Sequence, residues 1–410
     1  MSWNPVLNKV IEVKREWEKI CCHEFGSPIN TFEEMLEIVN IKEYNELFDC
    51  LQLNQFNEFL LIRYGLAEMQ KGMWEDENSI YRECRSVVID LKNECLVITP
   101  FKKFFNLDEV KENKLDNVLK KINEANIVEI VDKLDGSMQC ARWYNDNVFM
   151  SGSMAININN SWRLQDGMSM LTKNHKTMLK ENPEYTFVFE YISMKDAHVV
   201  LYNKEQEGLY LIGIRDVNTG IQLNYRDIKE FSKRYNVHMA KIENIKIDEV
   251  LKNMKIFKSN EKEGWILNID GHLIKIKCDD YVHLHRLLDK FSSVNVIIEN
   301  VAEGRIDDML SKVPESYIHR ITQISDKIIN WRDETLKNID KYYGLAPKTN
   351  TKEFMIWVDN EVPCEIKGYV KLKYKGIGFN VLKRKVEGYK KLKDLGICED
   401  YSALFSSLED

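Results

Sequence analysis

The stretch that decides the fold is Ile127-Val128-Glu129-Ile130-Val131-Asp132-Lys133-Leu134-Asp135-Gly136-Ser137. Its apolar first half predicts a buried strand, and Gly136 predicts a tight turn directly after that strand. Asp135 and Ser137 can hydrogen-bond to nearby main chain, so the turn would aim the amine of Lys133. A lysine at the mouth of a strand and turn can serve as a covalent nucleophile, although the same pattern alone also fits an ordinary hairpin.

The flanking sequence predicts further elements by its periodicity. Residues 6–65 show helical apolar spacing, which includes Phe56, Phe59, Leu60 and Ile62. Strand-like, helical and again strand-like patterns follow over residues 86–105, 107–126 and 127–277. Within the last of these, two hairpins are expected, with turns at residues 145–147 and at Asp270-Gly271. Helices are expected at residues 282–291, 294–303, 306–312 and 317–343, with a polar linker at 345–351.

Composition narrows the class of protein. The chain has 410 residues, of which 44% are hydrophobic, enough for about two domains. No apolar stretch approaches the roughly 20 residues of a membrane span, and the first residues do not resemble a signal peptide, so we expect a soluble cytoplasmic protein. The 9 cysteines are scattered and contain no Cys-x-x-Cys pair, which argues against a disulfide framework and a zinc site. His283 and His285 lack an evident third ligand, so we expect them to be structural or to face RNA.

The net charge of -7 is unlike that of a typical nucleic-acid binder, but the charge is unevenly distributed. Between residues 362 and 395, Lys and Arg far outnumber Asp and Glu, and tyrosines are interleaved with them. Two interpretations stay open for this segment. It is either a solvated helical face or a surface that contacts the RNA backbone, with tyrosines able to stack on bases.

Several downstream and upstream motifs accompany the lysine turn in a fixed order. They are Glu83-Cys84-Arg85-Ser86, Pro100-Phe101-Lys102-Lys103-Phe104-Phe105-Asn106, Thr186-Phe187-Val188-Phe189-Glu190-Tyr191, Leu209-Tyr210-Leu211-Ile212-Gly213-Ile214-Arg215-Asp216, Glu263-Gly264-Trp265-Ile266-Leu267 and Lys275-Ile276-Lys277. This succession resembles the covalent nucleotidyltransferase superfamily, and in particular the phage RNA ligase 1 family, over roughly residues 60 to 310. Each motif is common by itself, whereas their joint order is specific.

The resemblance implies an α+β fold with an ATP-grasp-like nucleotidyltransferase domain of antiparallel sheets at residues 1–285. An all-helical domain for RNA recognition would follow at residues 286–410. The implied activity is ATP-dependent ligation of 5′-phosphate and 3′-hydroxyl RNA ends through a lysine–AMP intermediate, with transfer RNA repair as the expected use. The implied cofactor is magnesium, with manganese as an alternative, and a separate kinase-phosphatase could prepare the ends.

The resemblance also assigns roles to residues. Lys133 would be the nucleophile, and neighbouring cations and a metal would lower its pKa from about 10.4. The residues expected to bind ATP are Tyr64, Arg85, Lys103, Glu190, Lys275 and Lys277. Glu263 and Asp307 would hold the metal. Taken singly, these residues also fit surface acids, a charged hairpin face and a helix N-terminus.

Two positions depart from the family pattern. Ser86 stands where glycine is usual, and Ser151-Gly152-Ser153 aligns with a Lys-Gly-Ser motif, so a family cation is missing. The second departure affects the expected efficiency of the later sealing steps. The rival functions are a DNA ligase, a capping guanylyltransferase and a non-catalytic RNA-binding homologue of a ligase. The helical pattern after residue 281 disfavours the first two, because those enzymes carry a β-rich OB module there.

Overall fold

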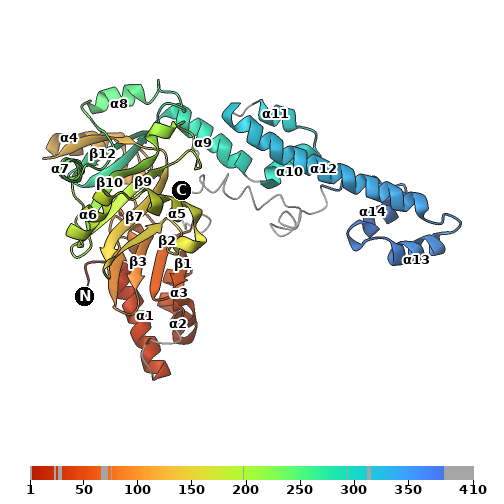
Figure 1. The fold of residues 1–410 in the computed structure, drawn as a ribbon, viewed down its shortest axis with the longest axis horizontal. Helices are drawn as coiled ribbons and strands as arrows, with labels where there is room; N and C mark the ends of the chain where they lie inside the picture. Colours follow the sequence, from red (N-terminus) through yellow and green to blue (C-terminus); the bar gives the residue numbers. More distant parts are fainter. Residues whose placement is uncertain are drawn as a thin grey trace. The chain divides into compact units, whose positions relative to one another are not determined.

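A computed structural model describes residues 2–22, 25, 30–65, 73–74, 76–196, 198–292, 294–311 and 315–382. These residues form two compact units that divide between His283 and Leu284. The first unit mixes helices with mainly antiparallel sheets, and the second is helical (Figure 1). The expected α+β class is therefore confirmed. No helix in the described part of the chain is long and apolar enough to cross a membrane.

The first unit contains three sheets. Its strands are β1 (Leu51–Phe56), β2 (Phe59–Tyr64), β3 (Arg85–Asp90), β4 (Cys95–Ile98), β5 (Phe105–Asn106), β6 (Val128–Lys133), β7 (Ser137–Tyr144), β8 (Asn147–Gly152), β9 (Tyr185–Ile192), β10 (Gly208–Asp216), β11 (Ile242–Glu243), β12 (Gly264–Ile269) and β13 (His272–Lys277). The strand orders are β1-β2-β3-β4, β10-β9-β7-β8 and β11-β6-β12-β13-β5. The last two sheets carry the lysine turn between them, because β6 belongs to one and β7 to the other.

Helices surround these sheets. They are α1 (Pro5–Cys21), α2 (Phe32–Val39), α3 (Lys42–Phe48), α4 (Leu115–Glu124), α5 (Trp162–Met170), α6 (Lys173–Glu181), α7 (Tyr225–Tyr235) and α8 (Ile247–Asn253), and α9 (Asp279–Ser292) begins in this unit. In Figure 1, α1 to α3 lie at the end of this unit beside β1 to β3. Trp17, Phe32 and Met35 from these helices are at most 1% exposed and pack in one cluster with the first sheet.

The expectation of a helix was wrong for residues 56–62. These residues form the hairpin of β1 and β2, in which Phe56 pairs with Phe59. Asn57 takes a φ of 53°, a conformation that asparagine tolerates and that closes a tight hairpin turn. Leu60, Leu61 and Ile62 are all buried, so the strand lacks the alternation of a half-exposed sheet, and its apolar run resembled a helical pattern.

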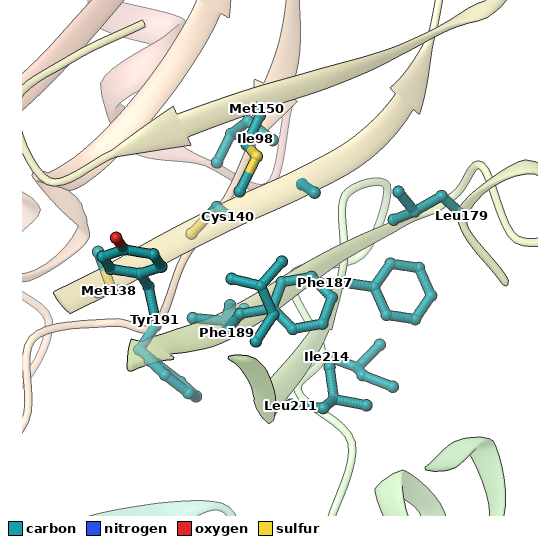
Figure 2. Packing of buried hydrophobic residues seen from close by; sticks show 14 of the residues in the cluster. Ile98, Met138, Cys140, Met150, Leu179, Phe187, Phe189, Tyr191, Leu211 and Ile214 are labelled. Carbon is teal, nitrogen blue, oxygen red and sulfur yellow. The ribbon is translucent and has the colours of Figure 1, made fainter. Parts of the chain in front are cut away.

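The two expected hairpins are confirmed. Asn145 and Asp146 both have positive φ between β7 and β8, and Asp270 and Gly271 do so between β12 and β13. A large core lies behind the second sheet. Figure 2 shows Phe187, Phe189 and Leu211 among its members, and Phe187, Phe189 and Tyr191 are each 0% exposed, as expected for core residues.

The second unit consists of helices in its described part. They are α10 (Val294–Ala302), α11 (Ile306–Leu310), α12 (Glu315–Leu345), α13 (Thr351–Glu361) and α14 (Cys364–Tyr374). Phe354 of α13 stacks on Tyr374 of α14 at a centroid distance of 3.9 Å, and both Phe354 and Val358 are fully buried. Residues 383–395 of the basic segment lie outside the described residues.

Candidate active site

The turn that carries Lys133 is fixed by its neighbours on both sides. Lys133 is the last residue of β6 and lies opposite Gly264 of β12. Gly136 donates its N–H to Glu190 Oε1 at 3.0 Å. A Cβ at position 136 would lie 2.4 Å from the carbonyl oxygen of Tyr191, so glycine is required by this close approach rather than by a positive φ. The turn therefore holds Lys133 and Glu190 in one place.

Glu263 joins two lysines of the site. Its carboxylate forms ion pairs with Lys133 at 2.6 Å and with Lys277 at 3.0 Å, and its side chain is 2% exposed. Burial alone would raise the pKa of Glu263, but the two ammonium groups outweigh burial and lower it to about 2. Because Lys133, Glu263 and Lys277 come from the ends of three adjacent strands, the sheet register itself assembles this group.

The protonation of Lys133 differs from the expectation. Burial disfavours the charged amine, but Glu263, Glu190 and Asp135 outweigh burial and raise the pKa of Lys133. The expected lowering by neighbouring cations was wrong, because carboxylates outweigh them around Lys133. Lys133 is thus held as an ammonium, and a nucleophilic role requires that this charge be released.

Glu190 titrates near neutrality. Burial raises its pKa to about 7; Lys133 opposes the shift, and Glu263 adds to it. Glu190 lies on β9, opposite Met138 of β7 in the same sheet, and its carboxylate accepts the N–H of Gly136 in the lysine turn. A carboxylate that changes charge near pH 7 beside a buried lysine is typical of functional sites.

A group of cations lies next to these residues. The guanidinium of Arg85 and the ammonium of Lys275 each lie 4.9 Å from the ring centre of Phe104. Burial, together with Arg85, Lys133, Lys103 and Lys277, lowers the pKa of Lys275 well below its usual value. Arg85 Nη1, Asn106 Oδ1 and Ser151 Oγ are buried without a hydrogen-bond partner among the described residues. The neighbouring like charges and the unsatisfied donor Arg85 Nη1 indicate a site for an anion.

Lys103 extends the group of cations at its other end. It donates to the hydroxyl of Tyr64 at 3.0 Å, and its ammonium lies 4.3 Å from the ring centre of Tyr64. The rings of Trp74 and Phe105 are 5.6 and 5.7 Å from the same ammonium. Three aromatic rings therefore surround Lys103. The structure thus brings together every expected nucleotide-binding residue, including Tyr64.

Lys133 is one of the residues that line a cavity of about 400 Å³. Its lining includes four aromatic side chains, namely Tyr202, Tyr210, Phe257 and Trp265. Lys262, which lines it too, forms ion pairs with Asp132 and with Glu243. Sequence reasoning missed this cavity, because its residues come from five separated segments and form no motif. Only the position of Lys262 beside Glu263 could have drawn attention to it.

The described residues contain no group of three or more His, Cys, Asp or Glu side chains arranged to hold a metal ion. Both oxygens of Glu263 already face lysines, so Glu263 does not fit the expected role of a metal ligand in this state. Asp307 lies on α11, which belongs to the second unit. The site fits only an ion that brings most of its ligands, such as magnesium bound to phosphates and water.

Comparison with known proteins adds independent information. A family model described as RNA ligase, of the phage RNA ligase 1 type, matches residues 83–283. A putative bifunctional polynucleotide kinase/RNA ligase of Autographa californica nuclear polyhedrosis virus is 23% identical over 294 residues, which cover 67% of this chain. The match spans 39% of that viral protein.

Solved structures of RNA ligases are also similar. An archaeal ATP-dependent RNA ligase is 13% identical with a TM-score of 0.44, covering 77% of this chain and 83% of the other. A Naegleria gruberi RNA ligase with pyrophosphate is 15% identical with a TM-score of 0.34, covering 41% and 55%.

Proposed function

Through residues 83–283 the chain belongs to the phage-type RNA ligase 1 family, and we propose that it is an ATP-dependent RNA ligase that works through a Lys133–AMP intermediate. One observation carries the proposal. Lys133 lines a cavity large enough for a nucleoside and lies close to the cations Lys277 and Lys275, so a nucleotide with its base in the cavity and its phosphates on these cations would bring its α-phosphorus to the amine. The sequence motifs and the geometry meet at this residue.

The groups of the site divide the nucleotide between them. The aromatic side chains of the cavity would stack on the adenine base. Arg85, Lys103, Lys275 and Lys277 would bind the phosphates, and the hydroxyl of Tyr64 would support Lys103. Glu190, next to the turn, would contact the ribose or a metal-bound water. The unpaired Arg85 Nη1 supports this assignment, because a phosphate oxygen would satisfy it.

The reaction consists of three nucleotidyl transfers. In the first, Lys133 Nζ loses its proton and forms a bond to the α-phosphorus, and the bond to pyrophosphate breaks. An oxygen of the RNA 5′-phosphate then displaces Lys133 from AMP, and finally the RNA 3′-hydroxyl displaces AMP and forms the phosphodiester. Lys133 is held as an ammonium by Glu263, Glu190 and Asp135, so the proton must leave its amine before the bond to phosphorus forms.

A magnesium ion, if bound with the triphosphate, would neutralise phosphate charge as pyrophosphate leaves. Glu190 is the described carboxylate best suited to hold such an ion through water, because Glu263 is engaged by two lysines. Manganese would satisfy the same oxygen donors. The protein groups keep their own tasks, which are to bind the phosphates, orient Lys133 and exclude bulk water.

We further propose that the natural substrate is RNA broken in a structured loop, with transfer RNA repair as the use. Such ends need a 5′-phosphate and a 3′-hydroxyl before sealing, so a kinase-phosphatase activity would act first. The name of the viral relative joins a polynucleotide kinase to an RNA ligase, which supports the pairing of end preparation with sealing.

The test is incubation with ATP labelled at the α-phosphate, in the presence of magnesium, followed by peptide mapping. We expect covalent AMP on Lys133 and sealing of a 5′-phosphorylated RNA oligonucleotide. Comparable labelling by GTP would favour a capping enzyme, and activity with NAD alone would reject the family's donor. Sealing of nicked DNA but not RNA would favour a DNA ligase, and absence of any label would favour the non-catalytic homologue.

A further inference from the structure

We propose that His198 is a positioning residue that carries a positive charge between Asp135 and Asp196 and thereby holds the Lys133 turn in its reactive conformation. The inference rests on the proposed function, since it concerns how the Lys133 amine is presented to a nucleotide. His198 belongs to no motif that the sequence revealed. Its place follows from the segment after β9, residues 193–202, of which residue 197 lies outside the described part.

This segment holds the lysine turn from both sides of Gly136. On one side, Asp135 Oδ2 accepts the N–H groups of Val199 and Val200 at 2.9 and 2.8 Å. On the other, Ser137 Oγ donates to Asp196 Oδ2 at 2.6 Å. The turn is thus bound to the segment through two carboxylates, one contributed by each partner.

His198 lies between these two carboxylates. Its Nδ1 is 3.7 Å from Asp135 Oδ1, and its Nε2 is 3.4 Å from Asp196 Oδ2. The three side chains are 8%, 4% and 1% exposed, so water screens the charges little. Because each ring nitrogen faces a carboxylate oxygen, the doubly protonated imidazolium is the form that suits both sides.

The other charged and polar groups around the pair agree with a cationic His198. Arg163 of α5 binds Asp196 Oδ1 at 2.8 Å, the hydroxyl of Tyr281 donates to Asp135 Oδ1 at 2.8 Å, and Glu190 of β9 adds a third carboxyl group nearby. Burial opposes the charged ring, but the bond to Asp196 and the charges of Asp135, Asp196 and Glu190 raise the pKa of His198 to about 9.

Removal of this charge would take away the cation beside the buried Asp135, while Asp196 would keep its ion pair with Arg163. The contacts of Asp135 with Val199 and Val200 would lengthen, and the turn would lose its attachment on the side nearest Lys133. Val200 and Tyr202 also line the cavity, and the hydroxyl of Tyr202 accepts the N–H of Asp135 at 2.9 Å. The position of the Lys133 amine relative to the adenine base in the cavity would therefore change. This change would slow the chemical step rather than prevent folding.

The test is single-turnover labelling by ATP at saturating concentration, which separates the rate constant from the fraction of active protein. We expect His198→Gln, which keeps hydrogen bonding without charge, to lower the rate constant at least tenfold while the amplitude stays near that of the unaltered protein. His198→Arg, which restores the charge, should recover part of the rate. The matched control is His175→Gln, because His175 is also buried, at 4% exposure, but caps α6 through Thr172.

An unchanged rate constant in His198→Gln, or a loss confined to the amplitude, would overturn the proposal. Amide hydrogen exchange at Val199 and Val200 gives a readout that needs no activity. It should be faster in His198→Gln than in the unaltered protein or in His175→Gln, and unchanged exchange would also overturn the proposal. If the unaltered protein takes no label while exchange responds as expected, the proposed function fails and the structural role of His198 stands.

Discussion

Cationic side chains cluster in two regions of this molecule, and the two regions differ in how far ion pairs balance the positive charge. On α14, two of the three described lysines form ion pairs. Lys371 pairs with Asp359, Lys373 pairs with Asp340, and Lys367 donates to the carbonyl oxygen of Asp359. In the first unit, neither Arg85 nor Lys275 forms an ion pair with any residue that the structure describes, and both lie against Phe104.

This difference indicates that the local balance of charge, rather than the number of lysines, distinguishes a site that binds an anion. Cations that repel one another without a counter-charge destabilise the folded state, so a protein that retains them does so for a ligand that supplies the missing charge. Paired surface lysines contribute little either to stability or to binding. The described part of the basic segment therefore favours the solvated face over an RNA contact surface.

The largest effect on labelling by ATP should come from removing the amine of Lys133. Lys133→Ala should abolish labelling by ATP, because no other group would form the bond to AMP. Lys133→Arg should be equally inactive, since a guanidinium stays protonated. Labelled-protein gels and peptide mapping check both variants, with Lys371→Ala as a control that should label normally. AMP found on Lys275 or Lys277 would contradict the assignment.

The next largest effect is expected at Lys275, where labelling by ATP and the free energy of unfolding should change in opposite directions. Lys275→Met should lower labelling at least a hundredfold yet raise the free energy of unfolding at pH 7 by roughly 1–3 kcal/mol, since a repelled buried cation is removed. The folded-state pKa of Lys275 is lowered, so its destabilising effect should fade as pH rises toward 10.5. Denaturant titrations at pH 7 and pH 10 measure this difference. A destabilised variant at pH 7 would show that the cation group is not strained.

A smaller effect concerns Glu190 and pH. Its pKa is raised to about 7, so the folded state binds a proton that the unfolded state releases near 4.5, and stability falls as pH rises between these values. Glu190→Gln should therefore match the unaltered protein at pH 4 and exceed it at pH 8 by roughly 1–3 kcal/mol. Thermal unfolding across this range tests the prediction. Asp227→Asn, at the exposed start of α7, serves as a control in which a carboxylate is replaced away from the site.

The smallest effect is expected on α14. The double substitution Lys371→Ala and Lys373→Ala should change the log–log salt dependence of RNA binding by less than about half a unit, because both lysines are already paired. Two free phosphate contacts would instead account for a loss of about 1.8 units. Filter binding of a nicked transfer RNA at several salt concentrations distinguishes the two, and a loss near the larger value would restore the RNA contact surface.

The sequence was sufficient where a feature is local. Turn residues predicted both hairpins, and the order of Lys133, Glu190, Glu263, Lys275 and Lys277 predicted which residues share a site. The sequence was insufficient where long-range packing decides. The run Leu60 to Ile62 is buried on both faces, so its period was uninformative.

The charge of Lys133 could not be read from its motif either, because it depends on carboxylates brought by β9 and β12. His198 was invisible for the same reason. Its importance comes from Asp135, which lies 63 positions earlier in the chain, and a lone histidine before an apolar run has no pattern of its own. Interactions of this kind require the strand register, which the sequence alone does not determine.

Trp3, which precedes α1, contacts a residue 214 positions later in the chain, and this has a consequence for synthesis in the cell. Its indole N–H donates to the carbonyl oxygen of Val217 at 2.7 Å, and Arg215 lies 4.7 Å from its ring centre. A ribosome adding about 5–20 residues per second reaches Val217 roughly 10–40 s after Trp3. During that interval α1 to α3 lack the contact between Trp3 and Val217. Nascent chains of this protein should therefore engage chaperones early, and slow codons between residues 100 and 217 should lengthen the time before the contact forms.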